Sequence, residues 1–78
     1  MPDVQKPKPE PGKEVVLKKL PPGLLDGLPD EDQKAIAKIV GKSVLLLQYD
    51  DIGRAELEFT DSAGVIHFIY VEPEFIEQ

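Results

Sequence analysis

Histidine and cysteine supply much of the nucleophile, base and metal-ligand chemistry of proteins, and this sequence of 78 residues has one His and no Cys. Nucleophile–base pairs built on cysteine, and His-rich zinc sites, therefore cannot be assembled. His67 stands in the apolar stretch VIHFIYV, where a strand would point it to the opposite side from Ile66 and Phe68. This setting is typical of a packed or half-exposed sheet residue rather than a ligand or an acid–base catalyst.

The carboxylates are numerous, but their spacing does not indicate catalysis. Glu56 and Glu58 would lie on the same side of one strand, where the absence of an apolar pocket favours a solvated face over an acid–base pair. The stretch 50–53 lacks the alternating oxygens and the terminal Glu of an EF-hand loop. The glycines are isolated, so no loop that cradles phosphate is predicted. We expect no catalytic residue, no metal and no cofactor.

Three aromatic residues near the ends of predicted strands are the remaining surface candidates. Aromatic anchors inside a polar rim carry many protein interfaces, and acids flank these aromatics in the sequence. The alternative is that the aromatics close the core. The candidate partner-binding residues are Tyr49, Tyr70, Phe75, Asp50, Asp51, Glu72 and Glu74.

The net charge of -6 is unevenly distributed along the chain. Residues 43–78 contain eight acids and Arg54 as the only Lys or Arg, a net of -7. Because affinity for nucleic acid comes largely from Lys and Arg at phosphates, nucleic acid is not expected as a partner. Such a field would instead steer a basic protein towards this half.

Hydropathy gives no sign of a membrane segment. The longest uninterrupted apolar run has only four residues, as at 44–47, far short of the roughly 18 residues that suggest a span. The first 13 residues have no apolar stretch typical of a signal peptide. We therefore expect a cytoplasmic protein with no membrane partner.

The chain divides into a tail and one domain. Residues 1–12 are rich in Pro and charge and cannot bury enough surface to offset their ordering entropy, so we predict a disordered tail. The domain is expected over 13–78. Its first strand is predicted at 14–20, ending in a type II turn centred on Pro22 and Gly23. The leucines that follow, Leu24, Leu25 and Leu28, are expected to fold back onto the core.

A helix is predicted at about residues 30–40. Asp30 and Gln33 have the spacing of a capping box, and acids in the first turn oppose the helix dipole. An apolar stripe follows with the period of a helix, and Gly41 is expected to end it at the C′ position. The stripe is Ala35, Ile36, Ile39 and Val40.

From Ser43 the apolar period changes to two. Residues 43–49 and 54–59 predict a β-hairpin around the turn 50–53. A second turn at 60–64 leads into VIHFIYV, whose nearly continuous apolar character predicts a strand buried from both sides. Pro73 ends that strand, and the last residues are expected to form one helical turn or a short closing strand.

This layout resembles the SH3-like small β-barrels of bacterial accessory proteins and small subunits. These barrels often open with Gly-x-x-Val-x-Leu, which 12–17 matches in slightly shifted register, and continue with a glycine turn, matched in part by 41–44. The resemblance covers residues 13–76 and implies a mostly β barrel of four to five strands. The helix predicted between the first and second strands is longer than the first loop of such barrels usually carries. It transfers no function. The sequence has no ALYDY-like run, so recognition of proline-rich peptides is not implied.

Two classes of function are consistent with these residues. The first is a small non-catalytic, acidic interaction or accessory module that binds a protein. Two features motivate it: the acidic half of the chain, and a small core without disulfides that would gain stability from a bound partner. An acidic mimic of nucleic acid that blocks a DNA-binding protein belongs to the same class. The second is a small metal-binding or enzymatic subunit that uses Asp and Glu side chains.

Overall fold

The computed structural model describes residues 8–78, and the part of the predicted tail at 1–7 lies outside the described residues. The fold is mostly β, as the sequence predicts. One helix, α1, stands between the first and second strands. The strands are β1 (Glu14–Leu17), β2 (Ser43–Tyr49), β3 (Ala55–Thr60), β4 (Ile66–Val71) and β5 (Ile76–Glu77); α1 spans Asp30–Lys38, and the 3₁₀ turn η1 spans Pro73–Phe75.

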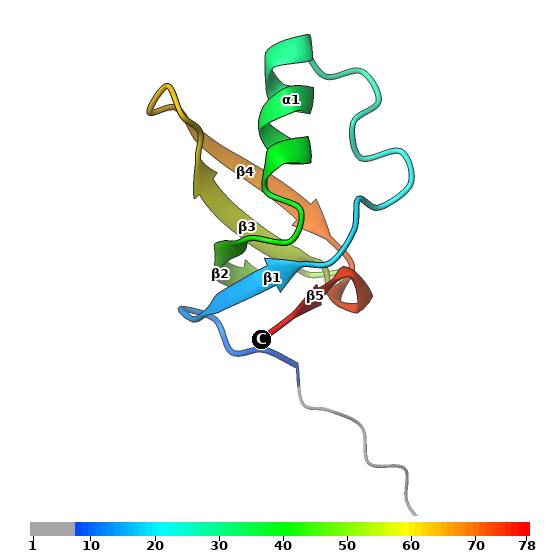
Figure 1. Cartoon of the computed structure of the whole chain (residues 1–78). Coiled ribbons are helices and arrows are strands. Elements are labelled where there is room, and N and C mark those ends of the chain that lie inside the picture. The colour runs from blue at the N-terminus through cyan, green and yellow to red at the C-terminus, as the bar shows by residue number, and fades with distance from the viewer. Residues whose placement is uncertain (1–7) are drawn as a thin grey trace, which may run out of the picture.

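The five strands form one antiparallel sheet in the order β4-β3-β2-β1-β5. The strands β2, β3 and β4 are a meander of two hairpins, and the chain closes by pairing β5 against β1. Figure 1 shows the curled sheet with α1 standing over one side of it. The edge strands of the sheet are therefore β4, with six residues, and β5, with two.

The core lies between α1 and the covered face of the sheet. Alternate residues of the strands supply it, because successive side chains of a strand point to opposite faces. The buried apolar residues are Val15, Leu17, Ala35, Ile36, Ile39, Val44, Leu46, Ala55, Leu57, Phe59, Ile69, Val71, Phe75 and Ile76.

The long connection from β1 to α1 packs as predicted. The amide of Leu24 donates to the carbonyl of Pro21, and Gly23 has a φ of +78°, the positive value that the third position of a type II turn requires. The first strand ends at Leu17 rather than at residue 20. The leucines after the turn are half-buried against the core: Leu24, Leu25 and Leu28.

The predicted capping box at Asp30 is wrong. Asp30 is the first residue inside α1, Pro29 occupies the N-cap, and no side chain caps the amides of the first turn. Gln33 instead reaches back, its Nε2 donating to the carbonyl of Leu28 over 2.8 Å. At the other end the C-cap is Ile39, so Gly41 comes one position later than C′.

Gly41 joins the helix to the sheet. Its φ is +84°, and its amide donates to the carbonyl of Leu17 over 2.8 Å, beside an isolated bridge between Leu17 and Val40. A residue with a Cβ would be strained at this φ. The glycine therefore turns the chain from α1 into β2 while keeping it bonded to β1.

Residues 9–12, at the end of the predicted tail, contact the sheet. Pro9 is buried, and its carbonyl accepts a hydrogen bond from the Tyr49 hydroxyl at 2.7 Å. The amide of Gly12 donates to the carbonyl of Leu46 over 2.7 Å. Residues 9–12 therefore lie against β2.

Burial of β4 from both sides, which its apolar sequence predicts, is wrong. The strand lies at an edge of the sheet, and α1 covers only one of its faces. Ile69 and Val71 are buried on that face, whereas Ile66, Phe68 and Tyr70 are exposed on the other. The near-continuous apolar run is thus the sum of a core row and a surface row.

Candidate functional site

The most unusual surface feature is a row of large apolar side chains on the uncovered face of β4. Ile66 and Phe68 are each 54% exposed and Tyr70 is 42% exposed. Their neighbours Ile69 and Val71 are 6% and 0% exposed, so the contrast follows the alternation of the strand. We call Ile66, Phe68 and Tyr70 the β4 row.

An acidic row lies beside the β4 row on the neighbouring strand. In the register of β3 and β4, Phe68 lies opposite Glu58 and Tyr70 opposite Glu56. The Tyr70 hydroxyl donates to Glu56 Oε2 over 3.1 Å, and Gln48 Nε2 donates to Glu56 Oε1 over 2.9 Å. Apolar area and negative charge therefore run side by side on this face.

The turn between β2 and β3 fixes the Tyr70 end of the row. The Arg54 guanidinium lies 5.2 Å from the centre of the Tyr70 ring, and Arg54 Nε donates to Asp50 Oδ2 over 2.7 Å. A hydrogen bond to the Glu56 carboxylate, with its negative charge, raises the pKa of the Tyr70 hydroxyl. Arg54, the only Lys or Arg after Lys42, is thus engaged by one acid and one ring.

Asp50 organises this turn through its carboxylate. Its Oδ1 accepts hydrogen bonds from the amides of Ile52 and Arg54 at 3.1 and 2.7 Å. Partial burial acts to raise the pKa of Asp50, but the hydrogen bonds from the Arg54 amide and side chain outweigh it and lower that pKa overall. Asp50 is therefore a structural element of the turn as well as a charge near the β4 row.

The structure does not bring the three predicted aromatic anchors together. Tyr49 pairs with Ala55, on the covered side of the sheet, and so faces away from Tyr70. Its hydroxyl is bonded to Pro9, and burial raises its pKa. Phe75 is 8% exposed and belongs to the core, with Lys19 Nζ 5.5 Å from its ring centre.

The predicted rim acids are also dispersed over several elements. Asp51 is exposed in the β2–β3 turn, and Glu72 and Glu74 are exposed around η1. Of the candidate residues, Tyr70 and Asp50 share the neighbourhood of Arg54. Sequence reasoning missed Ile66 and Phe68, although their shared parity with Tyr70 in an alternating strand was a usable signal.

His67 is packed in the sheet rather than free to act on a substrate. Its side chain is 10% exposed and stacks on Phe59 with ring centres 5.0 Å apart and planes 13° apart. Its Nε2 lies 2.8 Å from Asp61 Oδ2, and its Nδ1 lies 3.6 Å from Asp32 Oδ1. The imidazole thus links the first turn of α1 to the β3–β4 turn.

Asp61 holds that turn together in the same way as Asp50 holds the other. Its Oδ1 accepts hydrogen bonds from the amides of Ala63 and Val65, each at 2.9 Å. The hydrogen bond with His67, followed by that from the Val65 amide, lowers the pKa of Asp61. With both carboxylate oxygens engaged, Asp61 serves structure.

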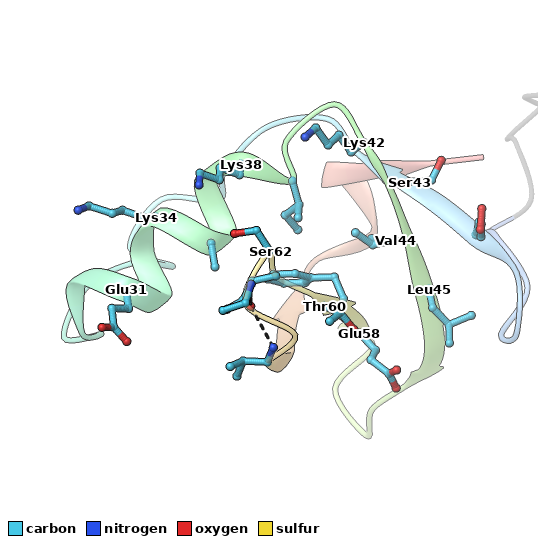
Figure 2. A pocket seen from close by; sticks show the side chains of 17 residues that line it. Glu31, Lys34, Lys38, Lys42, Ser43, Val44, Leu45, Glu58, Thr60 and Ser62 are labelled. Carbon is cyan, nitrogen blue, oxygen red and sulfur yellow. Dashed lines mark hydrogen bonds between the residues drawn. The ribbon is translucent and has the colours of Figure 1, made fainter.

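A groove of about 630 Å³ lies between α1 and the sheet. Its floor is apolar, and its sides carry lysines, hydroxyls and four acids, Glu14, Glu31, Glu58 and Asp61. Figure 2 shows Lys34 and Lys38 on the helix, Lys42 where the chain enters β2, and Thr60 and Ser62 on the hairpin. The apolar residues of the floor are Ala35, Ile39, Val44 and Phe59.

Within residues 8–78 no group of three or more His, Asp or Glu side chains is arranged to hold a metal ion. Over the same residues no helix has the length and apolar character needed to cross a membrane.

Comparison with known proteins gives no match to a family model, to a curated protein or to a solved structure. The fold and the site by themselves define a small, mostly β protein with one helix, an apolar row on an edge strand and a groove lined by apolar residues, lysines and acids. The function must be argued from these surfaces.

Proposed function

We propose that this protein is a small, non-catalytic interaction or accessory module that binds a protein partner through the β4 row. One observation carries the proposal: three large apolar side chains, 42% to 54% exposed, stand in line on one face of an edge strand. Single exposed apolar residues are ordinary, whereas a contiguous row is typical of an interaction surface.

The position of β4 supports a specific mode of binding. An edge strand presents backbone amides and carbonyls with no neighbour on one side, and an extended peptide can add to it as a further strand. Alternate side chains of the added strand would then lie beside Ile66, Phe68 and Tyr70. Main-chain bonds would give affinity, and the row would give selectivity.

The partner is an extended segment that carries Lys or Arg as well as apolar residues. Glu58 and Glu56 lie opposite Phe68 and Tyr70 on the neighbouring strand β3. Their negative charge complements a basic segment. A guanidinium or ammonium group placed over either ring would gain a cation–π contact, as Arg54 already does at Tyr70. Because the surface is acidic, nucleic acid is not part of the proposal.

We further propose kinship with the SH3-like barrels of bacterial accessory proteins. The element order supports it: a first strand, a long first loop, a meander of three strands, and a short turn before a closing strand. This kinship concerns architecture alone and adds nothing to the choice of partner.

A titration of the labelled full chain tests the proposed function. The probe is the capped peptide Lys-Val-Arg-Val-Lys-Val. Its binding is followed through the amide chemical shifts and the amide hydrogen exchange of the protein. We expect shifts and slowed exchange at Ile66, Phe68 and Tyr70, and weaker binding at high salt. Phe68→Ser should weaken binding by about tenfold or more, and Ile52→Ser, at an apolar residue 75% exposed in a turn, should not.

Two results would overturn the proposal. Shifts that map elsewhere, or equal binding by Phe68→Ser and Ile52→Ser, would exclude the β4 row as the binding surface. A concentration-dependent dimer that buries β4, measured by sedimentation with no peptide binding, would assign the row to a second copy of the chain instead.

A further inference from the structure

The two acids beside the β4 row are not equivalent. Both carboxylate oxygens of Glu56 are engaged, because Oε1 accepts from Gln48 Nε2 at 2.9 Å and Oε2 accepts from the Tyr70 hydroxyl at 3.1 Å. Among residues 8–78 no hydrogen bond or ion pair involves the carboxylate of Glu58. Figure 2 shows that carboxylate pointing away from the lysines of the groove, Lys34, Lys38 and Lys42. Of the two acids, Glu58 is therefore the one open to a partner.

The two rings of the β4 row differ in the same way. The Arg54 guanidinium lies 5.2 Å from the centre of the Tyr70 ring, and Asp50 Oδ2 holds it there by accepting from its Nε at 2.7 Å. Over the part of the chain that the structure describes, no Lys or Arg lies over the ring of Phe68, which is 54% exposed. The described chain thus supplies its own cation at Tyr70 and none at Phe68.

The surroundings of Glu58 strengthen its attraction for a cation. Its neighbours across the sheet are Phe68 on β4 and Leu45 on β2, and Glu58 itself is half-buried. A charge pair is screened less where apolar side chains displace water than where both charges are fully exposed. A cation at Glu58 is therefore held more strongly than one at an exposed acid of a turn, such as Asp51.

The backbone of the β4 row faces the open edge of the sheet. The amide of Asp61 donates to the carbonyl of Val65 over 2.9 Å where β3 and β4 meet at their turn. Hydrogen-bonded and non-hydrogen-bonded pairs alternate along an antiparallel ladder, and the register from this pair onwards is unbroken. The odd-numbered residues of β4 therefore direct their backbone groups to β3. The even-numbered residues, which are the β4 row, direct theirs to the edge.

A strand added at this edge would reach Glu58 only across Phe68. Neighbouring strands are about 4.8 Å apart, so the added strand would lie about 9.6 Å from β3. Lys and Arg have long apolar stems with the charge at the end, and such a stem can lie on the Phe68 ring while the charged group meets Glu58. In an antiparallel addition the partner residue opposite Phe68 exchanges both backbone hydrogen bonds with it and shares its face.

We propose that Phe68 and Glu58 form a subsite for one Lys or Arg of a partner segment that adds to β4 as an antiparallel strand. The cation stands opposite Phe68, and apolar residues two positions away on each side lie beside Ile66 and Tyr70. This inference rests on the proposed function and adds to it the residue that selects the cation. The selecting acid is Glu58 and not Glu56.

Two capped peptides that differ at one residue test the subsite on the full chain. They are Thr-Val-Thr-Arg-Thr-Val-Thr and Thr-Val-Thr-Gln-Thr-Val-Thr, titrated with amide chemical shifts as the readout. We expect the Arg peptide to bind the wild type about tenfold more tightly than the Gln peptide. Nuclear Overhauser effects should connect the side-chain methylenes of the peptide Arg to the ring of Phe68 rather than to that of Tyr70.

A matched pair of variants separates the subsite from net charge. In Glu58→Gln the preference for the Arg peptide should fall to about threefold or less, because the ion pair is lost and the contact with the Phe68 ring remains. Glu56→Gln makes the same charge change one pair further along β3 and should keep the preference within about twofold of the wild type. The amide spectra of the free proteins check that both variants are folded as the wild type is.

The outcomes distinguish this inference from the function on which it rests. Equal binding of the two peptides by the wild type, with shifts along the β4 row, would overturn the subsite and leave the proposed function standing. An equal or larger fall of the preference in Glu56→Gln would also overturn the subsite. If neither peptide shifted the β4 row, the subsite and the proposed function would both be wrong.

Discussion

The two faces of β4 are built from adjacent residues of one strand, yet they have different roles. The covered face contributes His67, Ile69 and Val71 to packing against the core and α1, whereas the uncovered face places Ile66, Phe68 and Tyr70 in solvent. The composition of the two rows is similar. Apolar residues in a strand therefore indicate burial only on a face that another element covers. In β4 no described element covers the face that carries Ile66, Phe68 and Tyr70.

The largest expected effect contrasts neighbouring residues of the two rows. Ile69→Ala should lower the free energy of unfolding by about 2–5 kcal/mol, because it leaves a cavity in the core. Phe68→Ala removes a half-exposed side chain and should cost less than about 1 kcal/mol. Urea unfolding measures both. Similar losses in the two variants would mean that the β4 row is covered in solution.

The two tyrosines give a second contrast with a smaller effect. Tyr49→Phe removes the hydrogen bond to the Pro9 carbonyl in a half-buried setting and should cost about 0.5–1.5 kcal/mol. Tyr70→Phe removes an exposed bond to Glu56 and should change stability by less than about 0.5 kcal/mol. Thermal unfolding of both variants is the measurement. If Tyr49→Phe left the stability unchanged, residues 9–12 would not be packed against β2 in solution.

The smallest effect concerns Asp61, the partner of His67 on the covered side, and it depends on pH. The pKa of Asp61 is lowered from its ordinary value of 3.8 by the His67 hydrogen bond first. The folded state therefore binds this proton less readily than the unfolded chain, and the stability contributed by the carboxylate is present above pH 3.8 and lost as pH falls through the folded-state pKa.

Asp61→Asn should therefore be less stable than the wild type at neutral pH, and the difference should narrow as pH falls below 3.8. Urea unfolding across an acid pH series measures this. Asp51→Asn, an exposed position in the other turn, is the control and should follow the wild type throughout. A difference for Asp61→Asn that stays constant down to strongly acid pH would exclude the carboxylate as the source of the pH dependence.

The local sequence determined much of the fold. Apolar residues at a period of two, separated by turn residues, predict the β2–β3 and β3–β4 hairpins, because strand pairing of neighbours needs only alternation and a turn. Pro22 and Gly23 determine their turn through fixed and positive φ values. The apolar stripe with helical period also predicted the bounds of α1 to within a few residues. The absence of Cys and the single His limited the chemistry before any fold was known.

Tertiary structure alone decided which side of each strand has a cover. Nothing in VIHFIYV states that β4 would be an edge, because an edge is a property of the whole strand order. The same order places Tyr49 and Tyr70 on opposite faces and draws Phe75 into the core through pairing of β5 with β1. The groove likewise exists only where α1 stands over the sheet, bringing Lys34 and Lys38 across from Thr60 and Ser62, which are more than 20 residues away in the chain.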